Sequence, residues 1–171
     1  MSSELGFEQV VDAAPSGQWG KSGKYLTFVL GGEDYGVDIT KIKEIIGGME
    51  VTSIPKTPSF IKGVINLRGK IIPVVDLRLK FGMSEAAHTR ETVFIVVEVA
   101  GSLMGVVVDS VQEVLYIQSS EIEPPPQLGA GIETSFILGI GKAQGKVSIL
   151  LDIDSVLSPE EASALRSISN A

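Results

Sequence analysis

The chain has 171 residues, 44% of them apolar, which is enough for a folded core and excludes disorder of the whole chain. Its formal net charge of −7 argues against nucleic acid or an anionic membrane as a partner, because phosphate binding needs an excess of Lys and Arg. The absence of Cys excludes disulfides, thiolate nucleophiles and Cys-based zinc sites.

We expect residues 1–22 to form a flexible tail, because they contain Gly, Ser and Pro and few regularly spaced apolar residues. The first residues have neither the basic nor the apolar region of a signal peptide. The longest apolar runs, such as residues 93–97, are too short to cross a bilayer. The sequence therefore predicts a cytoplasmic protein.

Short apolar segments separated by turns predict strands at the start of the folded part. Residues 25–30 and 35–39 form two predicted strands around a Gly/Asp turn. Residues 42–46 alternate apolar and charged side chains, which is typical of a half-buried strand, although they also fit a helical period. Their β-branched content favours the strand.

A rigid connector and a hairpin follow. Two prolines stiffen residues 54–58, and a short helical turn is expected at residues 60–61. Residues 64–67 and 70–75 flank an Arg-Gly turn and predict a hairpin.

Two residues at the end of this pattern have specific positional roles. Pro73 cannot donate a backbone hydrogen bond, so its strand is expected at a sheet edge or beside a β-bulge. Asp76 suits the N-cap of a helical turn over residues 77–80, which Gly82 would end.

The pattern then repeats, which is the strongest structural signal in the sequence. Two stretches of the first copy align with two of the second, residues 35–45 with 104–114 and residues 61–64 with 137–140. The extra residues of the second copy fall in the proline-containing segment 119–135. Such units are too small to bury a core alone, so we expect two barrels that share one core, with a groove between them.

Residues 158–171 predict a C-terminal helix and tail. Ser158 and Glu161 have the spacing of a capping box, and Pro159 suits the first helical position. Apolar residues at 162, 165 and 168 supply one buried stripe.

The sequence offers no set of residues for catalysis or metal binding. His88, the single histidine, has no Cys or acid partner nearby. The glycine-rich segment 139–146 has the wrong spacing for a phosphate-binding loop and precedes a predicted strand. Asp152 repeats the capping position of Asp76, and Asp154 is expected to be solvated. We therefore predict no enzyme activity, no catalytic residue, no metal and no cofactor.

The duplication also separates residues that the fold needs from residues that it does not. Both hairpin tips carry Gly, at positions 69 and 145, where a turn with positive φ favours it. The preceding residue is Arg68 in one copy and Gln144 in the other, so the turn does not require Arg. An exposed Arg can make a forked contact with a partner's carboxylate, and simple solvation explains Arg68 equally well.

Several segments of the chain closely resemble the CheW family of bacterial chemotaxis coupling proteins: residues 35–45, 54–69, 72–78 and 105–111. The Asn66-Leu67-Arg68-Gly69 segment is quite specific in this context. The resemblance implies a mainly β fold, with two SH3-like five-stranded β-barrel subdomains from the internal duplication, short helical turns and a C-terminal helix.

The resemblance covers residues 23–157 and implies the limits of the parts. The first barrel would span about residues 34–91. The second would span about residues 92–157, with strand exchange near residues 23–33. Residues 1–22 and 158–171 would remain outside as tail and C-terminal helix.

The function that the resemblance implies is an adaptor. In the family, the cytoplasmic tip of a chemoreceptor, a helical hairpin, docks in the groove between the barrels. The regulatory domain of the histidine kinase CheA packs against the first barrel. The protein would lie in the cytoplasm, at the inner face of the membrane through receptor clusters. Matching positions for receptor contact are Ile42, Glu44, Ile45, Lys62, Arg68, Val93 and Phe94. Positions for kinase contact are Ile54, Pro55, Val64 and Ile72.

Two other functions give distinct expectations. A barrel that binds nucleic acid would need a basic face and stacking aromatic residues, and the acidic charge and 6% aromatic content speak against it. A small enzyme would need a catalytic set, which the sequence lacks.

Overall fold

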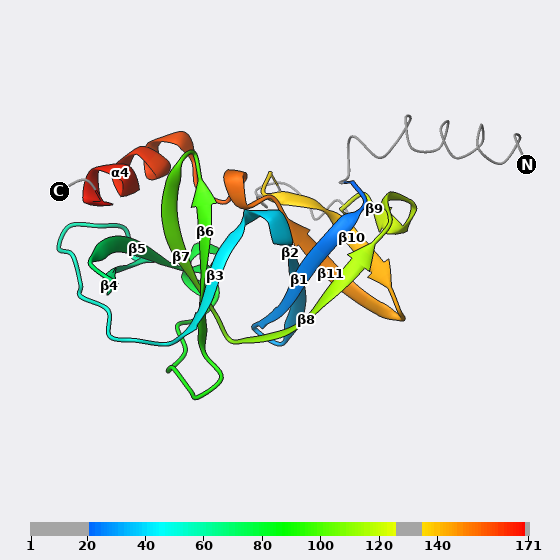
Figure 1. The fold of residues 1–171 in the computed structure, drawn as a ribbon, viewed down its shortest axis with the longest axis horizontal. Helices are drawn as coiled ribbons and strands as arrows, with labels where there is room; N and C mark the ends of the chain where they lie inside the picture. The colour runs from blue at the N-terminus through cyan, green and yellow to red at the C-terminus, as the bar shows by residue number, and fades with distance from the viewer. Residues whose placement is uncertain (1–20, 126–134, 170–171) are drawn as a thin grey trace, which may run out of the picture.

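The computed structural model describes residues 21–125 and 135–169, which form two β-sheets with short helices around them (Figure 1). The expected tail lies almost entirely outside the described residues. The six-stranded sheet has the order β8 (Ser110–Ile117), β1 (Gly23–Leu30), β2 (Glu33–Asp38), β11 (Lys146–Leu151), β10 (Ile137–Ala143) and β9 (Ile122–Glu123). The five-stranded sheet has the order β3 (Ile42–Gly47), β6 (Val93–Val99), β7 (Ser102–Val108), β5 (Lys70–Asp76) and β4 (Ile61–Leu67).

Each sheet closes in the same way, with one chain segment joining its two ends. In the six-stranded sheet, the turn η2 (Ser119–Glu121) carries β8 into β9, where Glu123 pairs with Ile140 of β10. In the five-stranded sheet, the chain leaves β3 and Thr52 pairs with Val64 of β4. The predicted mainly β fold with two barrels is therefore confirmed, although one sheet has six strands instead of five. We call them the six-stranded and the five-stranded barrel.

The two sequence copies are interleaved between the barrels. Hairpin β1–β2 of the first copy lies in the six-stranded barrel, and hairpin β6–β7 of the second copy lies in the five-stranded barrel. The expected division near residue 92 therefore does not follow the sheets. The reason is a pair of parallel contacts, β5 with β7 and β11 with β2, each of which joins strands from different copies.

Backbone geometry repeats between the copies. Arg68 and Gln144 have φ of 54° and 55° at the tips of hairpins β4–β5 and β10–β11. The amide of Asp76 donates to the carbonyl of Phe60 at 2.7 Å, and Asp152 donates to Phe136 at 2.8 Å. Register shifts also coincide, since one lies between Ile61 and Gly63 and the other between Ile137 and Gly139. The internal duplication predicted from sequence is thus visible in the fold.

The largest apolar cluster extends across both barrels. It includes Leu26 and Phe28 of β1 together with Ile95 and Val97 of β6, all buried. Each barrel also has a smaller cluster of its own, one around Leu115 and one with residues of β4 to β7. The expectation that the two barrels share one core is therefore confirmed.

Local signals fix the helices and turns. Asp76 accepts hydrogen bonds from the amides of Arg78 and Leu79 and caps α3 (Leu77–Lys80), as predicted. Asp152 likewise caps η3 (Ile153–Ser155).

The capping box of the C-terminal helix α4 (Pro159–Ser169) is also present. Ser158 donates its amide to Glu161 Oε1, and the Glu161 amide donates to Ser158 Oγ. The helical turn expected at residues 60–61 is wrong, because Ile61 already begins β4. Pro73 lies inside the sheet, beside the register shift of β4 and just before the pairing with β7 begins.

Candidate partner-binding surfaces

Hairpin β4–β5 presents Arg68 at its tip, on the surface of the five-stranded barrel. Its guanidinium forms a forked ion pair with Glu44 of β3, with Nη1–Oε2 and Nη2–Oε1 distances of 3.1 and 2.5 Å. The amide of Gly69 donates to Asn66 Oδ1 at 2.8 Å and fixes the turn. The hydrogen bonds from Arg68 lower the pKa of Glu44, so the carboxylate stays charged. Since both side chains face solvent, a partner can reach the pair.

An equivalent ion pair lies on the six-stranded barrel. Glu113 of β8 accepts a hydrogen bond from Lys146 Nζ at the start of β11. Glu113 aligns with Glu44, while Lys146 lies two residues after Gln144. Both copies therefore pair a strand carboxylate with a hairpin cation, although they take the cation from different positions. The common feature belongs to the fold, and the Arg68 fork is particular to the first copy.

Exposed apolar side chains flank both ion pairs. On the five-stranded barrel, Ile45 and Ile71 are 44% and 40% exposed. On the six-stranded barrel, Val114 and Val147 at the aligned positions are 48% and 58% exposed, and Tyr116 is 54% exposed. Large apolar residues that stay exposed on matching faces are typical of binding surfaces. We call the first set, Ile45 and Ile71, the first face, and the second set, Val114, Tyr116 and Val147, the second face.

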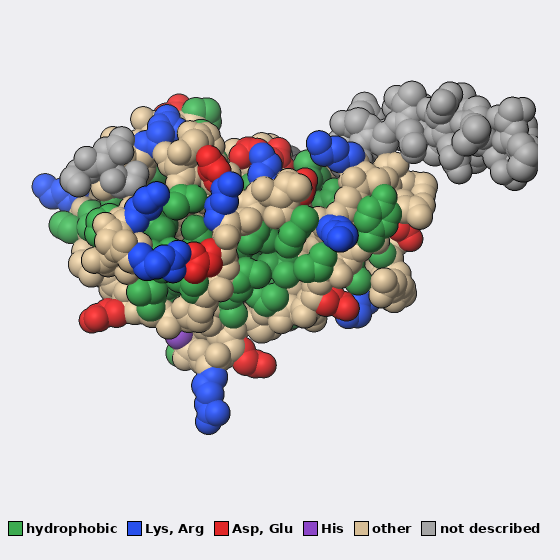
Figure 2. Space-filling model, viewed as in Figure 1, with side chains coloured by type: hydrophobic (Ala, Val, Ile, Leu, Met, Phe, Trp, Pro, Cys, Tyr) green, Lys and Arg blue, Asp and Glu red, His purple; other side chains and the backbone are tan. Residues whose placement is uncertain are grey.

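A partly buried apolar residue is also matched between the copies. Ile42 of β3 and Val111 of β8 occupy aligned positions, and both are partly buried against the shared core. Each lies where its strand changes register, Ile42 against β6 and Val111 against β1. Figure 2 shows apolar side chains gathered in the middle of the face that contains β3, β1 and β8, with Lys and Arg at its border. The surface where the two barrels meet on this face is therefore apolar.

A hollow of about 210 Å³ opens beside the first face. Its lining combines apolar side chains with the charged groups of β3 and hairpin β4–β5. The lining residues are Lys43, Glu44, Leu67, Arg68, Lys70, Ile72, Val96 and Leu103. Two of its three cations are paired within the chain, Arg68 with Glu44 and Lys43 with Glu98, so the hollow has an apolar floor with ion pairs at its border.

Most positions expected to contact a receptor lie at the surface of the five-stranded barrel. Glu44 and Arg68 bind each other, Ile45 is exposed at the next position of β3, and Ile42 is partly buried against the shared core. Lys62 is paired with Glu85. Val93, at the start of β6, is partly buried.

One expected receptor position and one expected kinase position are corrected by their burial. Phe94 is 0% exposed and packs in the core of the five-stranded barrel, so it supports the surface from inside. Ile72 is 1% exposed and belongs to the same core. The other kinase positions, Ile54, Pro55 and Val64, keep exposed surface.

Sequence reasoning missed the second face. Val114, Tyr116 and Val147 were assigned no role, because an apolar residue in a strand is more often buried than exposed. The duplication held the signal, since Val114 aligns with Ile45 and Val147 with Ile71.

Two further ion pairs hold the points where the chain crosses between barrels. Arg78 after β5 binds Asp109 between β7 and β8, with Nε–Oδ1 and Nη2–Oδ2 distances of 2.9 and 2.8 Å. Asp109 Oδ2 also accepts from the amide of Gly31 at 3.0 Å. The other crossover residue, Lys41, binds Asp154 at 2.7 Å, which corrects the expectation that Asp154 is only solvated. These contacts join the barrels and supply no chemistry of their own.

Within residues 21–125 and 135–169, no cluster of three or more His, Asp or Glu could hold a metal ion. His88 makes an edge contact with the ring of Phe94, with the centroids 6.0 Å apart. No described helix is both long and apolar enough to span a membrane.

Comparisons with known proteins agree with this geometry. A family model for the CheW-like domain matches residues 24–161. The chemotaxis protein CheW of Klebsiella aerogenes is 40% identical over 148 residues, which cover 86% of this chain and 89% of that protein. The chemotaxis protein CheW of Rhizobium meliloti is 34% identical over 139 residues, covering 81% and 90%. The crystal structure of the scaffolding protein TtCheW from Thermoanaerobacter tengcongensis superposes with a TM-score of 0.75 at 39% identity, covering 82% of this chain and 95% of that one.

Proposed function

The chain belongs to the CheW-like family of chemotaxis scaffolds, and we propose that it couples the cytoplasmic tips of chemoreceptors to the histidine kinase CheA. Its relatives named as chemotaxis proteins, and a solved relative described as a scaffolding protein, support this role. We further propose that it works in the cytoplasm at receptor clusters, through binding and without catalysing a reaction.

The observation that carries the proposal is a pair of apolar faces on two barrels that share one core. An adaptor transmits a signal only if a change at one partner alters the geometry that the other partner meets. Because the barrels are packed through a common core, a displacement at one face is transmitted to the other. Two domains joined by a flexible linker would move independently, so a displacement of one would not reach the other.

The receptor side is proposed at the groove and the first face. Ile42 and Ile45 would supply apolar contact for a helical hairpin, and Glu44 and Arg68 would supply charged, directional contacts. Lys62 and Val93 would extend this surface, with Phe94 supporting it from the core. For the kinase we propose Ile54, Pro55 and Val64, with Ile72 behind them.

Neither contact has to be strong by itself. A specific interface of about 800 Å² per partner is usual, and a micromolar dissociation constant corresponds to about −8 kcal/mol. Clustered receptors would add multivalency, which raises the effective affinity without new contacts.

The proposal is tested by reversing the charge of Arg68. The Arg68→Glu variant places a second carboxylate beside Glu44, so receptor-tip capture in a pull-down should fall about tenfold or more while the fold is kept. The matched control is Gln144→Glu, which makes the same final residue at the same φ on the other barrel and should leave capture unchanged. Unchanged capture by Arg68→Glu would remove this residue from the receptor surface. Loss with both variants would show a nonspecific charge effect.

A further inference from the structure

The C-terminal helix α4 packs on a barrel to which its preceding strand does not belong. β11 is part of the six-stranded barrel, yet α4 lies against β5 of the five-stranded barrel (Figure 1). The covalent connection between β11 and α4 therefore crosses from one barrel to the other, and it consists of η3 and the short segment after it. We call that surface, formed by Pro73, Leu103, Met104 and Lys80, the seat.

The seat recognises α4 through one charge and an apolar stripe. Leu165 is buried in the shared core, and Ala162 and Ile168 pack partly against it. Lys80 Nζ donates to both carboxylate oxygens of Glu161, at 2.8 and 3.0 Å. Glu161, Leu165 and Ile168 have the i, i+4, i+7 spacing of one helix face. The seat thus has the chemistry of a groove for an amphipathic helix.

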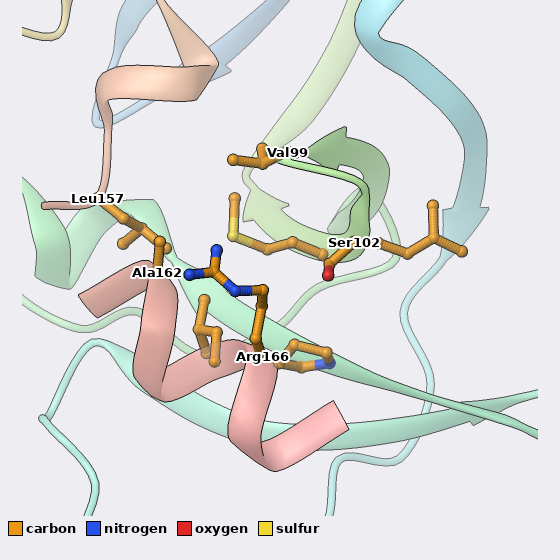
Figure 3. Close-up of a pocket in the computed structure, with 9 residues that line it drawn as sticks. Val99, Ser102, Leu157, Ala162 and Arg166 are labelled. Carbon is orange, nitrogen blue, oxygen red and sulfur yellow. The ribbon is translucent and has the colours of Figure 1, made fainter. Parts of the chain in front are cut away.

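Contact between α4 and the seat is incomplete. A cavity of about 20 Å³ remains beneath the helix, bordered by Val99, Ser102, Leu157, Ala162 and Arg166 (Figure 3). The side chain of Ala162 is too short to fill it, so a space large enough for a water molecule remains beside the helix. A helix of 11 residues is also marginal when it is not docked. Release of α4 should therefore be less costly than opening of the barrel strands.

We propose that the seat is a binding surface for an amphipathic helix of a partner protein, which takes the place of α4. The helix it fits carries a carboxylate at one position and apolar side chains four and seven residues later, because Lys80 and the apolar floor select those groups. While α4 is docked it competes with the partner, and the apparent affinity is reduced by the fraction of molecules in which the seat is open. This proposal does not depend on the proposed coupling role, because the seat contains none of the residues proposed to contact the receptor or the kinase.

The test uses a fluorescent peptide of residues 158–169 as the probe and the full chain as the receptor of that peptide. Two variants weaken the chain's own helix and leave the seat intact: Leu165→Ala removes the main apolar contact, and Glu161→Gln removes the charge on Lys80's partner. Fluorescence anisotropy should show that each variant binds the native peptide at least tenfold more tightly than the unchanged chain. A peptide with Leu165→Asp should bind none of them.

Specificity is checked by a charge exchange. A chain with Lys80→Glu should prefer a peptide with Glu161→Lys over the native peptide, which nonspecific adhesion would not produce. Circular dichroism establishes that each variant keeps its β structure, and if Leu165→Ala does not fold, Glu161→Gln decides. Equal peptide affinity for the unchanged chain and the folded variants, or absence of binding by all of them, would overturn the proposal.

Discussion

The two barrels have the same origin and the same closure, yet they present different chemistry at matching places. Both hairpin tips have positive φ at two successive residues, and both pair a strand glutamate with a cation. Only the first copy places Arg68 at the tip, where the second has Gln144. The turn geometry that the copies share is set by the fold, whereas Arg68 is a residue that the turn does not require.

Core packing differs between the barrels at one aligned position. In the five-stranded barrel, Ile65 is buried. In the six-stranded barrel the aligned residue is Gly141, where a Cβ would lie 3.1 Å from Ile117 Cδ1 and 3.3 Å from Leu150 Cδ1. Ile117 and Leu150 therefore fill the space beside Gly141, and the two interiors are packed by different residues.

The largest effect is expected at the crossing of β4 by the chain around Thr52. A Cβ at Gly63, whose φ is 143°, would lie 2.0 Å from the carbonyl oxygen of Thr52, and backbone on both sides prevents relief. Gly63→Ala should cost about 4 kcal/mol or more, or prevent folding. Gly69→Ala is the matched control, because it has positive φ with open space around it, and should cost about 1 kcal/mol. Urea unfolding followed by circular dichroism measures both, and similar losses would contradict the steric explanation.

A smaller effect tests the difference in core packing at Gly141. Gly141→Ile gives the six-stranded barrel the residue of the five-stranded barrel and should destabilise it by about 1–3 kcal/mol, because Ile117 and Leu150 already fill the space. Adding Ile117→Ala should recover part of that loss. If the double variant is less stable than the sum of the single changes predicts, the two positions do not compensate each other.

The smallest expected effect concerns the crossover ion pairs. The hydrogen bonds from Arg78 lower the pKa of Asp109 relative to the unfolded chain, in which it is about 3.9. Its stabilisation is therefore present above that value and is lost as the pH falls through the folded pKa. We expect Asp109→Asn to reduce the acid-dependent loss of unfolding free energy below pH ~4 by about 1 kcal/mol. If Asp109→Asn leaves the acid-dependent loss unchanged, the account of this ion pair is contradicted.

The sequence predicted the elements better than their arrangement. Periodicity found the strands, and side-chain chemistry found the caps at Asp76, Asp152 and Ser158, because these signals are local. The interleaving of the copies was predicted only in part. The resemblance implied strand exchange near residues 23–33, but the place of hairpin β6–β7 was not predicted, since parallel pairing of β5 with β7 depends on contacts between distant strands. The helical turn expected at residues 60–61 is wrong for a related reason, because Ile61 pairs with Val75 of β5, which is distant in sequence.

The binding surfaces could likewise be predicted where the signal is local in sequence and not where it depends on strand pairing. The exposed tip with Arg68 could be found from the difference between the copies. Burial of Phe94 and Ile72 could not, because a β-branched or aromatic residue in a strand has the same pattern on the inner and outer face until the register is known. The second face needed both the duplication and the exposed fractions of Val114 and Val147.

The most direct test of the two-partner scaffold is co-sedimentation of the kinase CheA with receptor-containing membranes, in the presence and absence of this protein. We predict that the kinase pellets with the membranes far more when the protein is added, and that Arg68→Glu reverses the gain while Gln144→Glu does not. A kinase that sediments equally with and without the protein would contradict the account.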